Sequence, residues 1–496
     1  MRYSACEILS KTLLIGLLTS LSAQAETSTT DCLKKHAYNF SEVLNCYKTS
    51  EASKPLTYIV KDSKPFPGVE HRSFELTSQY WSPEGLASPE HWKHDVEIYI
   101  PHDARHGRAL LYANNGTNLP ANNQPTKEPA DFTQEMALDV ARKTRTIVIS
   151  VSNIPNQYLT YTDDGMARTE DASVAHSWKL FLDAPESRPY MSLHVPMMES
   201  LVKAMDLAQK ELQPWKIESF IASGASKRGW AAWLSAIADE RINAVVPFVI
   251  DILAMDNVLE HTYQTFGKSW PLAFHDYHHE GITGGRHTEN FRKLLKIEDP
   301  LAYLNSAYAD RLSIPKYIVN ASSDDFFVPD NSDFYFDQLP GPKSLRVTPN
   351  ASHHGIRQFA ESSLIPVINR WQQNRPLPGI TTSTTANGTR QTVSLQFSEA
   401  PVKLTQWTAV NPQARDFRHS CAIRYEPRDV TPSSYLNAQV FVDTPEQGWS
   451  ATFVEATFAD GFVATTPVQI LPKHYPSALP PVIEPACKTL IDQQRH

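Results

Sequence analysis

Several features that would point to a particular cofactor or partner are missing from this sequence. Its 496 residues carry a net charge of −8 without a block of basic residues, which argues against nucleic acid as a partner. It has no Cys-x-x-Cys pair and no His-Glu-x-x-His motif, the usual signatures of zinc. We therefore expect neither a cofactor nor a metal. Apolar residues make up 41% of the chain and charged residues 20%, a globular composition whose length suggests two or three domains.

Long apolar runs are also scarce, and the one at the N-terminus is short. Lys11 precedes "TLLIGLLTSL" (12–21), and Ala23-Gln24-Ala25 then forms a small-x-small cleavage pattern. Ten residues are too few to span a bilayer, which needs about 20. We expect a signal peptide over 1–25, the alternative being a buried N-terminal helix. No later stretch could cross a membrane, so the mature protein is expected in the periplasm or outside the cell.

Cysteine is rare, with five residues in all, and its placement agrees with export. Cys6 would leave with the signal peptide, and Cys32, Cys46, Cys421 and Cys487 remain as disulfide candidates in an oxidising compartment. The four residues permit three pairings. Pairing neighbours along the chain would join Cys32 to Cys46 and Cys421 to Cys487, and the alternative is four free buried thiols.

Hydrophobic patterning divides the mature chain into segments. After a helical lead-in at 26–55 come alternating, strand-like runs at 56–62, 71–81 and 94–101. The continuous apolar runs 109–114 and 146–151 flank a helical stretch at 129–143, as in a βαβ unit of a buried parallel sheet. The pattern then repeats, with strands expected at 216–223, 242–250, 315–321 and 343–349 and helices at 197–212, 227–239, 332–339 and 355–374.

Two other regions differ in composition from this α/β domain, which we place at 56–376. Residues 255–311 are rich in aromatics and histidine without a clear strand and are expected to form a helical cap. After a connector rich in Pro, Gly and Thr, short alternating runs predict a small β-sandwich-like domain at 381–473, followed by a tail at 474–496. This domain could bind a glycan or only brace the α/β domain.

The stretch "SGASKRGW" (223–230) joins an expected strand to an expected helix. A serine at such a strand-turn-helix junction, here Ser226, is typical of a nucleophile elbow, in which a strained turn exposes the hydroxyl at a helix N-terminus. The usual G-x-S-x-G is altered, because the second glycine is Gly229 and the spacing is Gly224-x-Ser226-x-x-Gly229. The alternative is a serine that only caps the helix.

Partners for this serine follow in the order found in α/β hydrolases, which is serine, acid, histidine. Asp324 comes after the strand at 315–321, with Asp325 beside it as the alternative acid or a plain turn residue. His353 comes after the strand at 343–349, with His354 as the alternative. In such a triad the histidine takes the serine proton and later gives it to the leaving group, and the acid orients the imidazole.

An oxyanion hole would need backbone donors from two segments. The N–H of Lys227 follows the serine directly. The loop "ANNGTN" (113–118), which follows an expected strand, offers Asn115 and Gly116, unless it is an ordinary turn.

The cap contains two further clusters. Its aromatics could stack on sugars, but packing as core is the favoured interpretation; they are Tyr263, Phe266, Trp270, Phe274 and Tyr277. A group of His275, Asp276, His278, His279, Glu280 and His287 has His-x-x-x-His spacing but lacks a complete zinc motif, so a surface of the cap that faces substrate is preferred over a metal site.

Five segments together resemble the PhoPQ-activated pathogenicity-related protein family, which also includes autocrine proliferation repressor proteins. They are "ASGASKRGWAAWLSA", "PFVIDILAMDNVLEHTYQTFG", "PNQYLTYTDDGMARTEDA", "DDFFVPDNSDFYFDQLPGPKSLRVTPN" and "FADGFVATTPVQILP", and the resemblance spans about 33–473. It implies an exported α/β-hydrolase fold with a C-terminal β domain and a serine hydrolase linked to virulence or the cell envelope. Ser226, Asp324 and His353 match the family's motif positions. Ser323 replaces a glycine of the acid loop, and the doublet His353-His354 replaces a single histidine.

A looser resemblance, limited to the elbow, is to glucuronoyl esterases, which also carry a basic residue after the serine. In that light Lys227 would help to hold an oxyanion or an acidic sugar. The expected function is an exported serine hydrolase that cleaves an ester or amide of a small molecule, peptide or glycan through an acyl-enzyme. The alternatives are a carbohydrate esterase of the glucuronoyl type and an exported binding or signalling protein with a non-catalytic fold.

Overall fold

The computed structural model describes residues 28–118 and 126–492. The expected signal peptide at 1–25 lies outside the described residues, as do the last four residues of the tail. Within these two ranges, no helix is both long and apolar enough to cross a bilayer.

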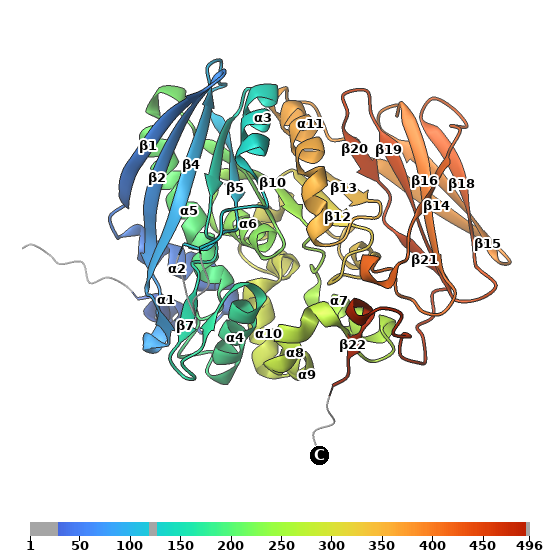
Figure 1. Ribbon diagram of the computed structural model, residues 1–496, viewed down its shortest axis with the longest axis horizontal. Coiled ribbons are helices and arrows are strands. Elements are labelled where there is room, and N and C mark those ends of the chain that lie inside the picture. Colours follow the sequence, from blue (N-terminus) through green and yellow to red (C-terminus); the bar gives the residue numbers. More distant parts are fainter. Residues whose placement is uncertain (1–27, 119–125, 493–496) are drawn as a thin grey trace, which may run out of the picture.

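A nine-stranded sheet forms the centre of the α/β domain (Figure 1). The pairs β1–β2, β2–β4 and β4–β6 are antiparallel. From β6 to the opposite edge of the sheet, all neighbouring strands are parallel. The strands in spatial order are β1 (Thr57–Phe66), β2 (Val69–Tyr80), β4 (His91–Pro101), β6 (Ile147–Val151), β5 (Arg108–Ala113), β9 (Ser219–Ala225), β10 (Ile242–Phe248), β12 (Lys316–Ala321) and β13 (Lys343–Thr348).

Helices cover both faces of this sheet, which is why its central strands are apolar on both sides. In β5, Ala109 and Leu111 belong to one buried cluster and Leu110 and Tyr112 to the other, as strand alternation requires. The first face is covered by α2 (Val43–Ala52), α5 (His194–Glu211) and α6 (Lys227–Ala238), and the second by α3 (Gln134–Thr144) and α11 (Ala360–Gln372).

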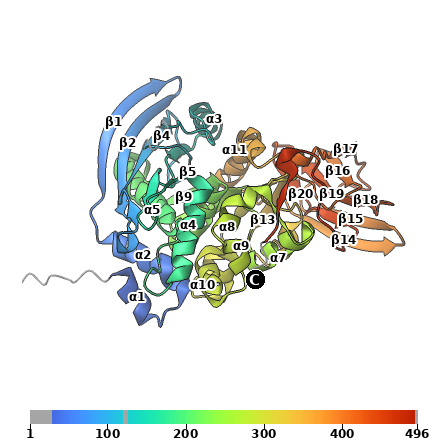
Figure 2. The same ribbon diagram turned by 60° about the horizontal axis from the view of Figure 1, so that its bottom comes forward.

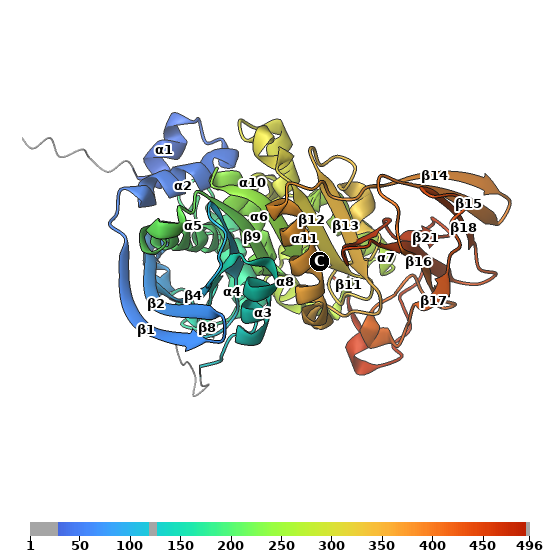
Figure 3. The same ribbon diagram turned by 90° about the horizontal axis from the view of Figure 1, so that it is seen from above.

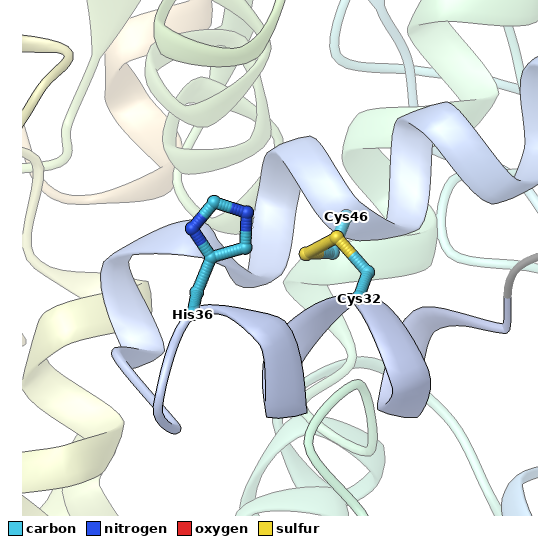
Figure 4. Close-up of side chains that lie close together, drawn as sticks. All are labelled: Cys32, His36 and Cys46. Atoms are coloured by element: carbon cyan, nitrogen blue, oxygen red, sulfur yellow. A yellow bond between two sulfur atoms is a disulfide. The ribbon is translucent and has the colours of Figure 1, made fainter.

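The N-terminal lead-in is fastened by a disulfide. Helix α1 (Thr29–Lys35) carries Cys32, and α2 carries Cys46; the two sulfurs are bonded and the Cα atoms lie 5.6 Å apart (Figure 4). The ring of His36 lies beside the pair in the same view but is not part of the bond. The disulfide holds α1 against α2, which itself packs on α5.

Between β10 and β12 the chain forms the helical cap. Figure 2 shows its helices gathered near α4 (Glu170–Asp183), on the side of the molecule that faces the viewer. The cap consists of α7 (Met255–Thr265), the short strand β11 (Trp270–Pro271), α8 (His275–His279), α9 (Ile282–Gly285) and α10 (Glu289–Glu298). A small sheet of β3 (Ala87–Ser88), β7 (Leu159–Tyr161) and β8 (Ala167–Arg168) precedes α4.

Two sequence-based expectations about helices differ from the structure. The helix predicted at 332–339 is wrong, because only a 3₁₀ turn at Asn331–Phe334 forms there. Asn331 and Tyr335 are both drawn to Asp251 by hydrogen bonds, which favours a compact loop over a regular helix. Helix α4 was not expected, and its start at Glu170 proves important for the site.

The C-terminal domain consists of two facing sheets, at the opposite end of the molecule from β1 and β2 (Figure 3). Val393, Val440 and Val454 from the two sheets lie in one buried cluster. The first sheet contains β14 (Ile380–Asn387), β15 (Arg390–Phe397) and β18 (Asn437–Asp443); the second contains β16 (Lys403–Asn411), β17 (Glu426–Asp429), β19 (Trp449–Thr457), β20 (Val463–Thr465) and β21 (Gln469–Leu471). The predicted fold class, an α/β domain with a helical cap followed by a β domain, is confirmed.

The tail returns from the β domain to the cap. A disulfide joins Cys421 to Cys487, and β22 (Thr489–Leu490) then pairs with β11 in an antiparallel ladder. Trp270 of β11 donates its indole N–H to Asp492 at 3.1 Å. Both disulfides of the structure therefore join cysteines that are neighbours along the chain, which is the local pairing.

Candidate active site

Ser226 occupies the sharp turn between β9 and α6. Its backbone has φ 56° and ψ −129°, a combination that costs free energy for any residue other than glycine. The turn is held because the N–H of Ser226 donates to Phe248 O on the neighbouring strand at 2.8 Å. Strain of this kind persists only where the surroundings enforce it, and the geometry is that of a nucleophile elbow.

The two glycines around this serine are required by packing between α6 and β9. A Cβ on Gly224 would lie 2.7 Å from the carbonyl carbon and oxygen of Arg228. A Cβ on Gly229 would lie 2.7 Å from Gly224 O and 3.2 Å from Phe248 O. The second glycine therefore serves the close approach of the first helical turn to the strand, which explains its position at Gly229.

The structure brings Ser226, His353 and Asp324 together in one chain of hydrogen bonds. Ser226 Oγ lies 2.9 Å from His353 Nε2. His353 Nδ1 lies 2.9 Å from each carboxylate oxygen of Asp324. These residues follow β9, β13 and β12, whose carboxyl ends meet at one edge of the sheet.

The surroundings hold this arrangement in a fixed geometry. Asp324 Oδ1 also accepts the backbone N–H of Phe326 at 2.8 Å, and the ring of Phe326 packs 4.6 Å from that of His353. His353 and Asp324 are buried, whereas Ser226 is partly exposed. Asp324 and His353 form the hydrogen bonds that link the carboxylate, the imidazole and Ser226. The neighbouring residues Asp325 and His354 take part in neither of these bonds.

A further buried carboxylate, Asp251, lies after β10 at the same edge of the sheet. It accepts the hydroxyl of Tyr335 at 2.5 Å. Burial raises the pKa of Asp251 well above its ordinary value, and the nearby Asp324 and Asp330 raise it further. Among the described residues His353 bonds to Asp324 and not to Asp251, so the geometry favours Asp324 as the partner of His353.

The two sides of the expected oxyanion hole face the same cleft. The N–H groups of Lys227 and Gly116 find no hydrogen-bond acceptor among residues 28–118 and 126–492. The N–H of Asn115, in contrast, donates to Asn114 Oδ1 at 3.0 Å. Asn115 Oδ1 in turn accepts the backbone N–H of Ala130 at 2.7 Å. Of the loop candidates, Gly116 thus keeps its donor available, while Asn115 shapes the loop.

The side chains of Lys227 and Arg228 are paired with carboxylates of the protein itself. Lys227 Nζ lies 2.9 Å from Glu170 Oε2 and 3.1 Å from Asp171 Oδ2. Arg228 lies 2.6 Å from Glu170 Oε1 and 3.6 Å from Asp131 Oδ2. Both basic side chains are almost fully buried, so the carboxylates compensate charges that would otherwise be costly.

The charges of this cluster stabilise one another. Burial by itself raises the pKa of Glu170, but the adjacent charges of Arg228 and Lys227 outweigh it and hold the pKa far below its usual range. Burial likewise lowers the pKa of Lys227, yet Asp171 and Glu170 overcome this and leave the pKa raised. The ammonium group of Lys227 is therefore charged and already engaged by two carboxylates.

Sequence reasoning missed Glu170, Asp171 and Gln157. Gln157 donates to Gly116 O at 2.8 Å and to Glu170 Oε1 at 3.0 Å, and its own Oε1 accepts the N–H of Glu170 at 2.8 Å. The signal was the sequence "RTEDA", since Thr followed by acidic residues is typical of a helix start. Nothing local, however, indicates that this helix begins next to the Gly116 loop, about 55 residues earlier, and the elbow at Ser226, about 55 residues later.

Two hollows meet at Ser226. The polar cleft, of about 440 Å³, is lined by His353, Gly116 and the charged cluster together with Lys127 and Arg357. The apolar cavity, of about 40 Å³, lies on the other side of the serine and is lined mainly by aromatic and aliphatic side chains of α6, the cap and the loop after β12. Ser226, Lys227, Asp171 and Phe326 border both.

The aromatic residues of the cap lie mainly at the apolar cavity or in the core, and its histidine cluster lies at or near the protein surface. Trp270, Phe274 and Tyr277 line the apolar cavity, so these aromatics are at once core and cavity wall. Phe266 is buried, whereas Tyr263 is partly exposed beneath Arg286. In the histidine cluster, the exposed His275 stacks on His279 and contacts Asp276. The other members contact different carboxylates or histidines: His278 contacts Asp492, His287 contacts Glu260, and Glu280 contacts the buried His176.

The fold is that of the α/β hydrolases: a mostly parallel sheet is covered on both faces, with a strained serine after β9 and its hydrogen-bonded partners after β12 and β13. The chain belongs to the PhoPQ-activated pathogenicity-related protein family, whose family model matches residues 44–418.

A relative and two solved structures complete the comparison. Autocrine proliferation repressor protein A of Dictyostelium discoideum is 32% identical over 417 residues, covering 79% of this chain and 82% of that protein. An acetyl xylan esterase from Paenibacillus sp. R4 is 14% identical with a TM-score of 0.44, over 66% of this chain and 93% of that one. A glucuronoyl esterase from Solibacter usitatus is 11% identical with a TM-score of 0.34, over 62% and 85% of the two chains. At these scores the structural likeness carries no inference about function.

Proposed function

We propose that this protein is an exported serine hydrolase that cleaves an ester or amide bond through an acyl-enzyme. The observation that carries the proposal is the hydrogen-bond chain from Ser226 Oγ through His353 to Asp324, built on a backbone strained at Ser226. Such strain costs about 1–3 kcal/mol, and a serine that only capped a helix would not need it.

The geometry supports a specific division of roles. Ser226 Oγ attacks the carbonyl carbon while its proton passes to His353 Nε2, and Asp324 stabilises the resulting imidazolium. The tetrahedral intermediate then collapses, and the same proton is delivered to the leaving group as the bond to it breaks. Water repeats the sequence on the acyl-enzyme, with its proton taken by His353 and returned to Ser226 as the acid departs.

The oxyanion of both intermediates would be bound by the N–H groups of Lys227 and Gly116. The positive end of α6 adds to the donor at Lys227, because that residue is the first of the helix. The side chains of Lys227 and Arg228 serve a different purpose: through Glu170, Asp171 and Asp131 they fasten α6 to α4 and to the loop before α3. An acidic sugar would have to compete with two carboxylates for Lys227, which makes a glucuronoyl esterase the less favoured alternative.

Export is supported by the two disulfides. Disulfides persist in the periplasm and outside the cell. One of the two lies in the N-terminal lead-in, and the other fixes the tail that reaches the cap. The signal peptide expected at 1–25 from the sequence agrees with this proposal.

The proposal is tested by hydrolysis of p-nitrophenyl esters and aminoacyl-nitroanilides by the wild type and by Ser226→Ala. We expect Ser226→Ala to lower kcat by at least about 10⁴-fold, because nucleophile and base act as a unit. The matched control is Ser235→Ala in the same helix, which should keep wild-type rates. Within the described part of the chain, the Ser235 hydroxyl bonds only to the backbone carbonyls of Ala231 and Met198. Undiminished activity of a folded Ser226→Ala variant would contradict the proposal, and biological activity without hydrolysis would favour a binding or signalling role.

A further inference from the structure

The apolar cavity beside Ser226 has a consequence for the substrate. Its walls include Trp230 from α6, Ile252 from the loop after β10, Met255 and Leu259 from α7, and Phe274 from the cap. Two polar groups of the wall are bonded to the protein: Trp230 donates its indole N–H to Glu298 O at 2.5 Å, and Tyr277 donates its hydroxyl to Asp171 at 3.0 Å. The indole N–H of Trp178 has no acceptor among the described residues. The wall of the cavity is therefore mainly carbon.

The two hollows are not equivalent with respect to the triad. His353 and Gly116 line the polar cleft and do not line the apolar cavity. The leaving group must lie within reach of His353 Nε2 to receive its proton, and the oxyanion must lie at the donors of Gly116 and Lys227. Three of the four substituents of the tetrahedral carbon are then fixed: Ser226 Oγ, the oxyanion and the leaving group. The fourth, the acyl chain, is left to point into the apolar cavity.

The volume of the cavity limits this chain. About 40 Å³ of space is available. A space of this size can hold a short chain of a few heavy atoms. The polar cleft is about ten times larger and carries charged and amide side chains, so it suits a bulkier, polar alcohol.

We propose that the substrate is an ester in which a short, uncharged, apolar acyl group of about four carbons is carried on a polar alcohol. This inference rests on the proposed serine hydrolase function. Ser226 forms a new ester with the acyl group, the bond between the carbonyl carbon and the alcohol oxygen breaks, and the alcohol leaves through the polar cleft with the proton from His353. Water then releases the short-chain acid from Ser226.

The position of the cap helps to keep this cavity small. Trp270 borders it and is fixed from behind by the β11–β22 pairing and by its bond to Asp492. The tail that provides these contacts is tied by the Cys421–Cys487 disulfide. Figure 1 shows β22 close to the cap helices α8 and α9, so the tail closes the outer side of the cap.

The test is a series of p-nitrophenyl esters, from acetate through butyrate and hexanoate to octanoate, assayed with the wild type. We expect kcat/KM to rise about fourfold per methylene up to butyrate, because each buried methylene contributes a nearly constant increment. Beyond the capacity of the cavity, kcat/KM should fall at least tenfold by octanoate. A steady rise to octanoate, or a maximum at acetate, would overturn the inference.

Two variants test the cavity itself, and the ratio of hexanoate to butyrate kcat/KM is the readout because it does not depend on the fraction folded. Leu259→Ala enlarges the cavity and should raise the ratio about tenfold. Ile252→Phe fills it and should move the preference towards acetate. Leu294→Ala is the control: this buried leucine of α10 does not line the cavity, and the ratio should stay within about twofold.

The outcomes separate this inference from the proposed function. Ester hydrolysis that depends on Ser226, with ratios that do not change in Leu259→Ala and Ile252→Phe, would overturn the acyl-chain assignment alone. No hydrolysis of any ester, together with no modification of Ser226 by an active-site phosphonate, would overturn both.

Discussion

Ser226 adopts a left-handed backbone because the chain must turn from β9 into α6 within one residue. Gly224 and Gly229 make that turn possible, since the first turn of α6 lies against the strand without room for a Cβ at either position. The altered spacing of the glycines is therefore a packing feature of this elbow and does not weaken its identification. A shift of α6 would move Ser226 and so disturb its hydrogen bond to His353.

The first prediction concerns Gly224→Ala. The added Cβ would lie 2.7 Å from backbone atoms of Arg228, so α6 must move away from β9. We expect a loss of about 1–3 kcal/mol in the free energy of unfolding and a fall in kcat of at least tenfold as Ser226 leaves His353. Denaturant unfolding and ester hydrolysis measure the two effects.

Gly284→Ala is the matched control for this change. Gly284 lies in α9, and a Cβ added there would have no other atom within 4 Å, so the free energy of unfolding should be unchanged or slightly higher. Equal stability and activity of the Gly224→Ala and wild-type proteins would show that the elbow tolerates the side chain and that the packing explanation is wrong.

At the scale of elements, three segments distant in sequence meet where we propose that the oxyanion is bound. The loop after β5 supplies Gly116, α6 supplies Lys227, and the start of α4 supplies Glu170. Gln157 links the first of these to the third. The precision of the site thus depends on a buried amide that touches none of the three residues of the hydrogen-bond chain.

The second prediction is that Gln157→Ala lowers kcat about tenfold to a hundredfold with little change in KM, because the Gly116 loop is no longer held against the start of α4. The loss of its buried hydrogen bonds should also cost about 1–3 kcal/mol in the free energy of unfolding. Gln79→Ala is the control, since Gln79 is an equally buried amide that bonds to Pro196 O and Ser200 away from the site. If kcat falls equally in Gln157→Ala and Gln79→Ala for an equal loss in the free energy of unfolding, Gln157 only stabilises the fold and does not position the Gly116 loop.

Much of this arrangement could be predicted from the sequence, and the exceptions have a common cause. The strands around Ser226, Asp324 and His353 were evident because parallel strands buried on both faces are continuous apolar runs. The choice between neighbouring residues, such as Asp324 or Asp325, could not be made, because it depends on side-chain direction within a loop. The sequence before α4 fits a helix start, but the role of this helix comes from contacts with Lys227 and Arg228, which no local pattern encodes.

At the scale of the whole molecule, one buried network connects the α/β domain, the cap, the β domain and the tail. Asp330, in the loop after β12, lies 2.5 Å from Arg415 of the β domain and 2.9 Å from His261 of α7. The other ring nitrogen of His261 lies 2.8 Å from the hydroxyl of Tyr475 in the tail. Asp330, Arg415 and His261 are buried, whereas Tyr475 is exposed. Removing the Asp330 carboxylate would leave the buried charge of Arg415 without its ion-pair partner.

The third prediction is that Asp330→Asn costs about 3–5 kcal/mol in the free energy of unfolding at pH 7, because Arg415 is left unpaired in the interior. Burial by itself raises the pKa of Asp330, but Arg415 and His261 outweigh it and hold the pKa far below its ordinary value of 3.8. A carboxylate whose pKa is lowered on folding stabilises the protein above its unfolded pKa, and the stabilisation falls as the pH drops below that value. The difference between wild type and variant should therefore be largest near neutral pH and shrink below about pH 4.

Asp443→Asn provides the comparison for this pair. Asp443 forms a similar Arg–Asp contact with Arg390 at 2.7 Å, but both side chains are more than half exposed, so the change should cost less than about 1 kcal/mol. Equal costs for the two substitutions, or a difference at Asp330 that persists unchanged to pH 3, would contradict the role assigned to the buried network.

The most direct test of the central claim is to treat the mature protein with a fluorophosphonate and to locate the adduct by peptide mass spectrometry. We expect one adduct per chain, on Ser226, formed as Oγ displaces fluoride from phosphorus, and no adduct in Ser226→Ala or His353→Ala variants that remain folded. An adduct on another residue of the wild type, or one that persists in both variants, would contradict it.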